Sequence, residues 1–210
     1  MMKIDSVAAQ PDRAGRHAVR FSDGTVMRLY RQTVEDFGLY PGLELDDQQI
    51  KKLKTAAGEM SAKMRAVRII TSASVSKQEL ERRLVQKGEN PEQAKQAVAW
   101  MSELRLVDDG ETARQIVGSC IRKGYGLARA KQALYEKRIP KEYWQEALQE
   151  YPDQLDAITN FLQSRLCGSD DPKQLRKAVD ALLRKGHSYS HIRKALDMLS
   201  VAAEDFPEGE

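Results

Sequence analysis

The chain has 210 residues and a net charge of +3; 31% of its residues are charged and only 6% are aromatic. This composition is typical of a water-exposed helical protein and argues against a β-rich or a disordered chain. The sequence has no run of about 18 apolar residues, which excludes a membrane-spanning helix. Residues 1–16 lack the apolar core of a secretory signal, so we expect a cytoplasmic protein.

The first 48 residues are predicted to form a small β-containing module. Residues 4–9 and 16–30 are rich in β-forming side chains, and Ser22-Asp23-Gly24 interrupts the second segment. Asp-Gly between two such runs predicts a two-residue hairpin turn, in which both turn residues take positive φ. A short helix is expected over 33–37, ending at Gly38.

From about residue 46 the pattern is helical, and nine helices are expected before an acidic tail at 204–210. Ser76 begins a capping box with Glu79, and Gly88 ends the helix that follows. Pro91 and Pro140 stand where helices begin, because proline is favoured in a first helical turn.

The helices fall into a repeat of about 49 residues. Gly88, Arg138 and Gly186 are 50 and 48 residues apart, and apolar residues recur at four fixed offsets from each. Offset −8 is occupied by Leu80, Ala130 and Ala178, and offset −4 by Leu84, Leu134 and Leu182. Offset +6 is occupied by Ala94, Trp144 and Ile192, and offset +10 by Val98, Leu148 and Leu196.

The predicted fold is therefore mainly α, with three tandem three-helix repeats in an elongated curved array, preceded by the β-containing module. The expected divisions are 1–48, 49–107, 108–151, 152–203 and the tail 204–210. IRKGYG at 121–126 and LRKGHS at 183–188 look like copies, yet the register assigns them to different helices of their repeats. Both are interpreted as helix stops with a basic last turn.

Positive charge gathers around these two stops. Residues 119–141 and 172–194 each contain seven Lys or Arg and one acidic residue, so each has a net charge of +6 and the rest of the chain −9. Clustered charge indicates recognition of a charged partner, although solvated helix faces are a common alternative.

Catalytic and metal-binding patterns are absent from the sequence. Phosphate-loop, nucleophile-elbow and zinc-protease motifs are all missing. His187 and His191 have the spacing of two ligands on one helix face, but no third ligand lies near them. The pairs 108–109 and 170–171 are two aspartates each, and they precede helices, where capping is the expected role. We expect no enzyme activity, metal or cofactor.

The aromatic and cysteine residues are interpreted in the same way. Trp100 and Trp144 lie on helical stripes and are expected to pack between helices, whereas Tyr125 is kept as a contact candidate. Cys120 lies on an apolar stripe and is expected to be a small buried residue; Cys167 forms no C-x-x-C pair.

Several motifs follow one another in order: ELERRLVQKG at 79–88, LRLVDDGETARQIV at 104–117, KGYGLARAKQAL at 123–134 and KRIP at 137–140. Together they resemble the RecX family of recombination regulators, over about residues 60–200. The matching positions are Glu79, Leu80, Leu84, Lys87, Gly88, Leu106, Val107, Asp108, Asp109, Ala113, Lys123, Gly124, Leu134, Lys137 and Ile139. Thr112 replaces the family's usual aromatic residue, and Arg138 its second glycine.

The resemblance implies a non-enzymatic regulator of homologous recombination and the SOS response. Such a protein binds the RecA recombinase in the groove of its filament on DNA and mostly inhibits filament growth and activity. Some members also bind DNA directly, so single- or double-stranded DNA is a second expected partner. Without coiled-coil heptads, a monomer is expected.

The family provides no catalytic or contact residues to transfer to this chain. The candidate contacts therefore depend on charge clustering alone, and they are Arg122, Lys123, Tyr125, Arg129, Lys131, Arg184 and Lys185. An autonomous DNA-binding helical-repeat protein that does not depend on RecA is the alternative. The third hypothesis is a repeat scaffold for another protein partner, or an enzyme whose site the sequence does not reveal.

Overall fold

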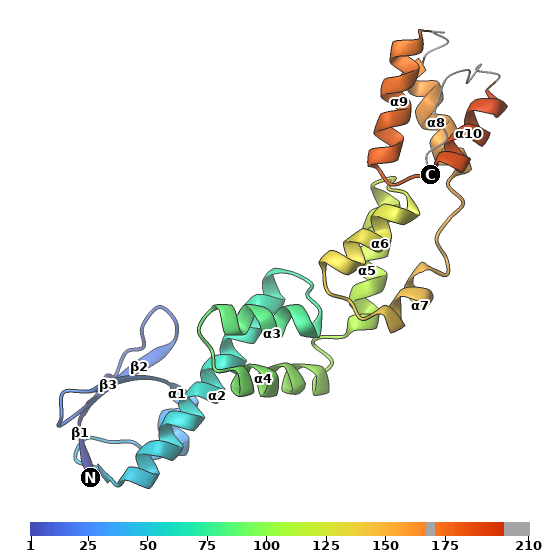
Figure 1. The fold of residues 1–210 in the computed structure, drawn as a ribbon. Helices are drawn as coiled ribbons and strands as arrows, with labels where there is room; N and C mark the ends of the chain where they lie inside the picture. The colour runs from blue at the N-terminus through green and yellow to red at the C-terminus, as the bar shows by residue number, and fades with distance from the viewer. Residues whose placement is uncertain (167–170, 200–210) are drawn as a thin grey trace. The chain divides into compact units, whose positions relative to one another are not determined.

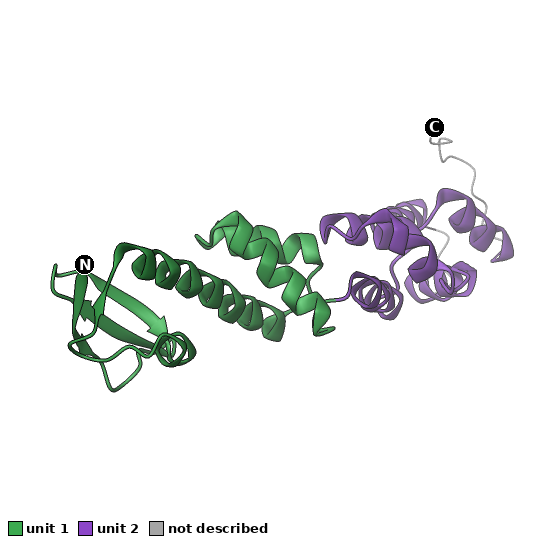
Figure 2. Cartoon of the chain, turned by 90° about the horizontal axis from the view of Figure 1, so that it is seen from below, with its two compact units in different colours: residues 1–107 green, residues 108–210 purple. Residues whose placement is uncertain are grey.

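The computed structural model describes residues 1–166 and 171–199 and consists mainly of α-helices, with one small sheet near the N-terminus (Figure 1). The predicted fold class, mainly α with a β-containing module, is confirmed. The chain divides into two compact units, Met1–Val107 and Asp108–Glu210 (Figure 2). Within the described ranges, no helix is long and apolar enough to cross a membrane. Cys167, Asp170 and the acidic tail lie outside these ranges.

The N-terminal sheet has four antiparallel strands in the order β3-β2-β1-β4. The strands are β1 (Met2–Val7), β2 (Arg16–Phe21), β3 (Val26–Tyr30) and β4 (Glu44–Leu45). Sequence analysis predicted the segments of the first three strands and missed β4. A strand of two residues is too short to show the alternation on which such predictions depend.

The hairpin turn between β2 and β3 differs from the prediction. The N–H of Phe21 donates to the carbonyl of Thr25, and the N–H of Gly24 donates to the carbonyl of Phe21. Gly24 has a φ of 83°, whereas Asp23 is absent from the positive-φ residues. The loop is therefore the three-residue kind, in which only the last residue is left-handed. The Asp23 side chain accepts bonds from Thr25 and stabilises this form.

A single long helix, α2 (Asp47–Ser72), belongs to two hydrophobic cores (Figure 1). It begins at Asp46, which forms a capping box with Gln49. Its first half buries Ile50 and Leu53 against the sheet and α1 (Arg31–Asp36). The first turns of α2 therefore share a hydrophobic core with the N-terminal sheet.

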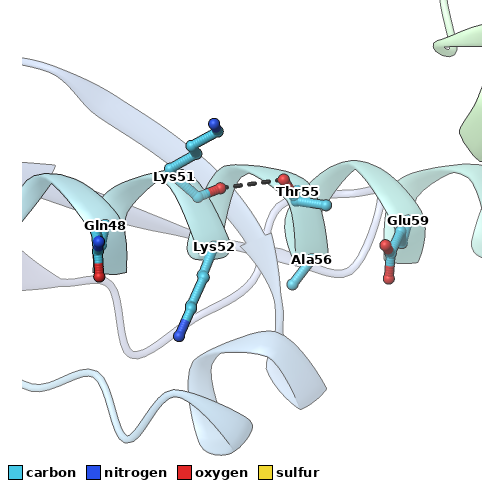
Figure 3. A pocket seen from close by; sticks show the side chains of 6 residues that line it. All are labelled: Gln48, Lys51, Lys52, Thr55, Ala56 and Glu59. Carbon is cyan, nitrogen blue, oxygen red and sulfur yellow. Dashed lines mark hydrogen bonds between the residues drawn. The ribbon is translucent and has the colours of Figure 1, made fainter.

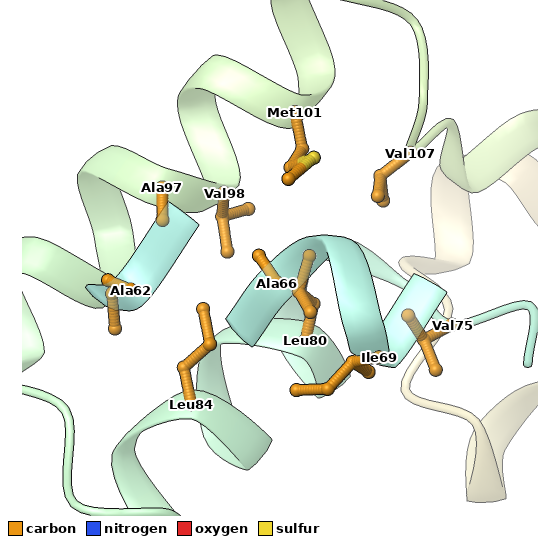
Figure 4. Packing of buried hydrophobic residues seen from close by; sticks show 11 residues of the cluster. Ala62, Ala66, Ile69, Val75, Leu80, Leu84, Ala97, Val98, Met101 and Val107 are labelled. Carbon is orange, nitrogen blue, oxygen red and sulfur yellow. The ribbon is translucent and has the colours of Figure 1, made fainter. Parts of the chain in front are cut away.

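The second half of α2 packs against α3 (Lys77–Gln86) and α4 (Pro91–Glu103). Small residues on α2, Ala62 and Ala66, let the helices approach closely, and Leu80, Leu84 and Met101 fill the space between them (Figure 4). All five of these side chains are fully buried. This cluster is the core of the first three-helix group.

Three helix stops confirm the register of the repeat. Gly88, Arg138 and Gly186 have φ values of 90°, 56° and 85°. After each of them, the next N–H bonds back to the carbonyl of the residue at position −4, with N···O distances of 3.1, 3.0 and 3.1 Å. This is the Schellman motif. The side chains at position −4 are buried in all three groups.

The middle group departs from its neighbours in its third helix. It contains α5 (Asp109–Arg122) and α6 (Leu127–Glu136), followed by a 3-10 turn, η1 (Lys141–Tyr143), and the short α7 (Trp144–Leu148). Trp144 and Leu148 are only partly buried, whereas the equivalent residues of the other groups are buried. The indole N–H of Trp144 donates to the carbonyl of Ile139 at 3.0 Å and fixes the short segment.

The last group consists of α8 (Leu155–Leu166), α9 (Pro172–Arg184) and α10 (Tyr189–Met198). Its core is formed by aliphatic side chains from all three helices, including Ile158, Leu182 and Ile192. Asp171 caps α9 and Ser188 caps α10 through bonds to backbone N–H groups. α10 begins after His187, which therefore lies outside the helix, as expected.

Candidate interaction surface at the paired glycine turns

The two stretches that look like copies in the sequence contact one another in the structure. The N–H of Gly126 donates to the carbonyl of Lys185 at 2.8 Å, and the N–H of Ala128 donates to the carbonyl of Gly186 at 3.3 Å. The turn that precedes α6 is thereby joined to the turn that ends α9, and Figure 1 shows these two helix ends meeting. Sequence analysis did not predict this contact.

Close backbone approach explains two of the glycines. A Cβ atom on Gly126 would overlap the carbonyl group of Gly186, and one on Gly186 would overlap the backbone of Arg129. Gly124 and Gly186 also have positive φ, at 62° and 85°, whereas Gly126 does not. Gly126 is therefore required for the contact and not as a helix stop.

The contact also provides hydrogen-bond acceptors for backbone N–H groups at the start of α6. Helix α6 has no side-chain cap, because its N-cap residue is Gly126. The N–H groups of Gly126, its N-cap, and of Ala128, in its first turn, bond instead to the carbonyls of Lys185 and Gly186, which directly follow α9. The negative end of one helix dipole then meets the positive end of the other, which is the favourable alignment.

Two further side chains hold the turns. His187 is 6% exposed, and its Nε2 lies 3.2 Å from the carbonyl oxygen of Gly124. The hydroxyl of Tyr151 donates to the carbonyl of Tyr125 at 2.7 Å. Burial raises the pKa of Tyr151 to about 12, so this hydroxyl keeps its proton and remains a donor.

Burial lowers the pKa of His187, despite the opposing effect of its bond to Gly124. Neutral His187 donates from Nε2, because a carbonyl can only accept. Its Nδ1 then carries a lone pair, and this atom is buried without a hydrogen-bond partner among the described residues. The histidine thus links the two turns through its bond to Gly124. No group of three potential metal ligands occurs within residues 1–166 and 171–199.

The structure brings together the two sets of candidate contact residues. Because the turns are joined through their backbones, the set from 122–131 lies beside the set from 184–185. Five of the seven side chains are exposed, namely Arg122, Lys123, Arg129, Lys131 and Arg184. We call these five residues the basic surface.

The other two candidates are less available. The ammonium group of Lys185 lies 4.8 Å from the centre of the Phe161 ring, a cation–π contact. Tyr125 is half-buried, and its carbonyl is bound to Tyr151. Within the basic surface, Arg129 lies 3.5 Å from Glu136, but both side chains are about half exposed, so the pair is weak.

A cleft of about 380 Å³ opens beside the basic surface. Leu127, Ala128, Tyr151 and Pro152 form much of its apolar lining, and Lys131 and Asp153 bring charges of opposite sign to it. A separate hollow lies along α2, where Gln48, Lys52 and Glu59 share a face with Lys51 and Thr55 (Figure 3). The lining of that hollow consists of amide, ammonium and carboxylate groups spread along one helix. These groups do not point toward a common centre.

Most residues of the motifs that resemble the RecX family lie in helix cores or at helix ends. Leu80, Leu84, Ala113 and Leu134 are fully buried. Lys87 and Gly88 end α3, and Gly124 ends α5. Leu106 is the exception, with 53% of its surface exposed.

The acidic motif residues serve the helices. Asp108 caps α5, and Asp109 is buried in its first turn. Glu79 is buried at the start of α3, where its carboxylate binds Arg82 and Arg83, each at 2.7 Å. These bonds, Arg82 first, lower the pKa of Glu79 to about 2. Capping therefore explains Asp108, and ion pairing explains Glu79.

Comparison with known proteins identifies the family. A sequence profile described as "RecX, second three-helix domain" matches residues 108–148. The regulatory protein RecX of Clostridioides difficile (strain 630) is 26% identical over 208 residues, covering 94% of this chain and 94% of that protein. The regulatory protein RecX of Escherichia coli O9:H4 (strain HS) is 31% identical over 143 residues, covering 62% of this chain and 86% of that protein. The chain belongs to the RecX family.

Two solved structures have the RecX fold. A regulatory protein RecX superposes with a TM-score of 0.66 at 22% identity, covering 94% of this chain and all of that one. RecX from Lactobacillus salivarius superposes with a TM-score of 0.59 at 20% identity, covering 69% of this chain and 98% of that one. The two departures from the RecX pattern leave the helices in place: Thr112 is buried, and Arg138 takes the left-handed conformation that glycine favours.

Proposed function

We propose that this RecX protein is a non-enzymatic, cytoplasmic regulator that binds the RecA–DNA filament as a monomer and limits filament growth. The observation that carries the proposal is the basic surface, which the glycine contact assembles from two distant parts of the sequence. A concentrated positive surface recognises negative protein walls or phosphates and accelerates encounter with them.

The residues of the basic surface lie at or near the ends of three helices. Arg122 and Arg184 are the last residues of α5 and α9, Lys123 follows α5, and Arg129 and Lys131 lie in the first half of α6; all five are exposed. Arginine binds carboxylates and phosphates through paired hydrogen bonds, so it suits either partner.

Autonomous DNA binding is the second candidate, because exposed cations are also what a phosphate backbone attracts. The two candidates differ in salt dependence and in preference. A filament regulator binds RecA filaments on single-stranded DNA more tightly than the same bare DNA. An autonomous DNA-binding protein binds both equally, with a steep loss of affinity as salt rises.

The test is an affinity titration against both ligands between low and physiological salt. The variant carries Arg122→Glu, Lys123→Glu, Arg129→Glu and Lys131→Glu, and we expect its affinity for filaments to fall about 10-fold or more. A matched control reverses four exposed cations of the other unit, Arg31, Lys51, Lys52 and Lys54, to Glu. The control variant is expected to stay within about 2-fold of the wild type, as expected for charges outside the interface.

Two results contradict the proposal. Equal affinity for filaments and bare DNA would remove the preference for RecA. Undiminished inhibition of RecA ATPase activity by the reversed variant, with its circular dichroism unchanged, would show that another face makes the contact.

A further inference from the structure

The four-stranded sheet of the first unit has one long edge (Figure 1). The strand order β3-β2-β1-β4 leaves β3 and β4 at the two edges. β4 has only two residues, whereas β3 has five, without proline and without a register shift against β2. An edge strand presents a row of backbone N–H and C=O groups to another strand unless it is short, bent or interrupted. β3 has none of these three protections.

The hydrogen-bond register determines which backbone groups of β3 point away from the sheet. The N–H of Phe21 in β2 donates to the carbonyl of Thr25, and backbone groups alternate in direction along a strand. Met27 and Leu29 therefore bond to β2. The outward N–H groups are those of Val26, Arg28 and Tyr30. No hydrogen bond from these three N–H groups occurs among the described residues.

Positive side chains border this edge. Val26 is opposite Arg20 in the register, so Val26, Arg20 and Arg28 share the outer face of the sheet, away from the core. Val26 is 45% exposed. Both arginines are exposed, and neither forms a salt bridge within the part of the chain that the structure describes. At the end of β3, Arg68 of α2 lies 3.4 Å from the hydroxyl of Tyr30 and adds a third guanidinium group.

The acidic groups of the module leave this edge positive. β2 and β3 contain no acidic residue. Asp12 is paired with Arg16 at 2.9 Å. Asp23 lies in the hairpin loop, where it accepts bonds from Thr25, and Asp5 lies on β1, two strands from the edge. The acidic residues of α1 belong to a helix that packs on the core face of the sheet.

A second copy of the chain does not suit this edge. Arg28 is the middle residue of β3, so antiparallel pairing of two β3 strands along their full length would place the Arg28 of each copy opposite the other. Like charges directly opposite one another destabilise a strand pair. DNA suits the edge no better, because its sugar–phosphate backbone has acceptors but no donors for the outward carbonyls of β3. A peptide strand has both.

We propose that β3 is a strand-addition site for an extended acidic segment of a partner protein. The backbone of the segment pairs with the outward groups of Val26, Arg28 and Tyr30. Carboxylates on alternate residues lie over the outer face, with Arg28 beside them and Arg20 one strand further, and form charge-assisted hydrogen bonds. The residues between them are apolar and lie on the core face beside Met27, which is partly buried. The site is in the first unit, so the inference goes beyond the proposed function, whose basic surface is in the second.

The first experiment detects strand addition directly. The probe is a synthetic peptide of about six residues that alternates glutamate and valine, since six residues is a usual strand length. Hydrogen exchange of backbone amides in the full chain is measured by NMR with and without the probe. At a probe concentration about 10 times its dissociation constant, exchange at Val26 and Arg28 should slow about 10-fold, because their N–H groups become bonded. Met27 and Leu29 are bonded to β2 already, so their exchange should change less.

This alternating pattern of protection is what strand addition requires. Probe binding without slower exchange at Val26 and Arg28 would mean contact through side chains alone and would overturn the proposal. Protection of the same two amides that appears without the probe, as the protein concentration rises, would also contradict it, because it would show pairing with a second copy.

The second experiment tests the charges, by fluorescence anisotropy of labelled probes. Arg20→Glu together with Arg28→Glu is expected to weaken binding of the acidic probe about 10-fold or more, and a probe that alternates lysine and valine should bind this variant instead. The control, Lys51→Glu together with Lys52→Glu, makes the same change of net charge at exposed positions of α2 and should stay within about 2-fold of the wild type. An equal loss in the control would refute the assignment to β3, since it would show only an effect of net charge.

The third experiment tests the backbone. Val26→Pro removes one outward N–H but keeps every charge and every bond to β2, because proline is tolerated on the outer side of an edge strand. Binding of the acidic probe should weaken about 3- to 10-fold, whereas Val26→Thr, which keeps the N–H, should stay within about 2-fold of the wild type. Unchanged binding by Val26→Pro, with native circular dichroism, would rule out strand addition. Displacement of the probe by an equal concentration of single-stranded DNA would assign the face to nucleic acid and contradict the proposal.

Discussion

The N–H of Gly126 donates a 2.8 Å hydrogen bond to the carbonyl of Lys185, so the end of α9 completes the first turn of α6. The bond passes between backbones and depends on no side chain at Gly126. Any side chain at that position would push the two turns apart. The basic surface is assembled where these two turns approach.

Replacing Gly126 with alanine is therefore expected to lower the free energy of unfolding of the second unit by about 2–3 kcal/mol, since overpacking against backbone is not easily relieved. Urea unfolding, followed by circular dichroism, measures the change. Gly118→Ala is the control, because Gly118 lies inside α5 and its new methyl group would meet only the Arg122 side chain at 3.4 Å. There we expect stabilisation of about 0.5–1 kcal/mol. A Gly126→Ala variant as stable as the wild type would refute the close approach.

Arg138→Gly is expected to stabilise the protein. Arg138 holds a φ of 56°, a conformation that disfavours side chains with a Cβ. Glycine removes this cost, and a gain of about 0.5–1 kcal/mol is expected after its greater unfolded-state entropy is counted. Gly88→Ala, at the equivalent helix end of the first group, should lower the free energy of unfolding by a similar amount, because Gly88 also has a positive φ. Thermal melts of both variants are the measurement, and a destabilised Arg138→Gly protein would contradict the interpretation.

Mild acid is expected to weaken the joined turns. Burial lowers the pKa of His187 below its ordinary value of 6.5, so the unfolded chain binds the proton more readily than the folded one. Stability is complete above pH 6.5 and falls as the pH drops below it, by up to about 1.4 kcal/mol at pH 5.5. Urea titrations between pH 7.5 and 5.5 measure the effect. In the His187→Leu variant, the free energy of unfolding should depend less steeply on pH. An unchanged pH dependence would assign the titration to another group.

The ion pairs of Glu79 predict a second loss at lower pH. Its pKa is about 2 in the folded protein against 4.5 ordinarily, so its contribution is present above pH 4.5 and disappears as the pH falls toward 2. Because Arg82 and Arg83 are about one-third exposed, water weakens the pairs. Glu79→Gln is expected to cost about 1–2 kcal/mol at pH 7 and nothing near pH 2. A cost that persists at low pH would show that packing, and not charge, is responsible.

The local elements of the fold were predictable from the sequence because their signals are local. Glycines and caps set the ends of the helices, and apolar spacing located the buried positions Leu84, Leu134 and Leu182. The contact of Gly126 with Gly186 was not predictable, since it arises from two turns that are far apart in sequence. One signal was available: α6 starts at a glycine, without the usual Ser, Thr or Asp cap.

The candidate contacts were selected from charge alone, which could indicate where cations gather but not which of them are engaged. The structure shows Lys185 above Phe161 and leaves the five residues of the basic surface exposed. The short α7 was also unexpected, because Pro140 and its following apolar residues have the pattern of a full helix. There the indole N–H of Trp144 donates to the carbonyl of Ile139, a contact that periodicity does not report.

The 26 residues of α2 have a consequence for how the first unit unfolds. Ile50 and Leu53 anchor one end in the sheet module, and Ala62 and Ala66 anchor the other in the three-helix core. Neither core can lose its packing without fraying a helix that the other core requires. Heat or denaturant should therefore melt the sheet module and the first helix group in one cooperative step, and their slowest-exchanging amides should report the same opening free energy.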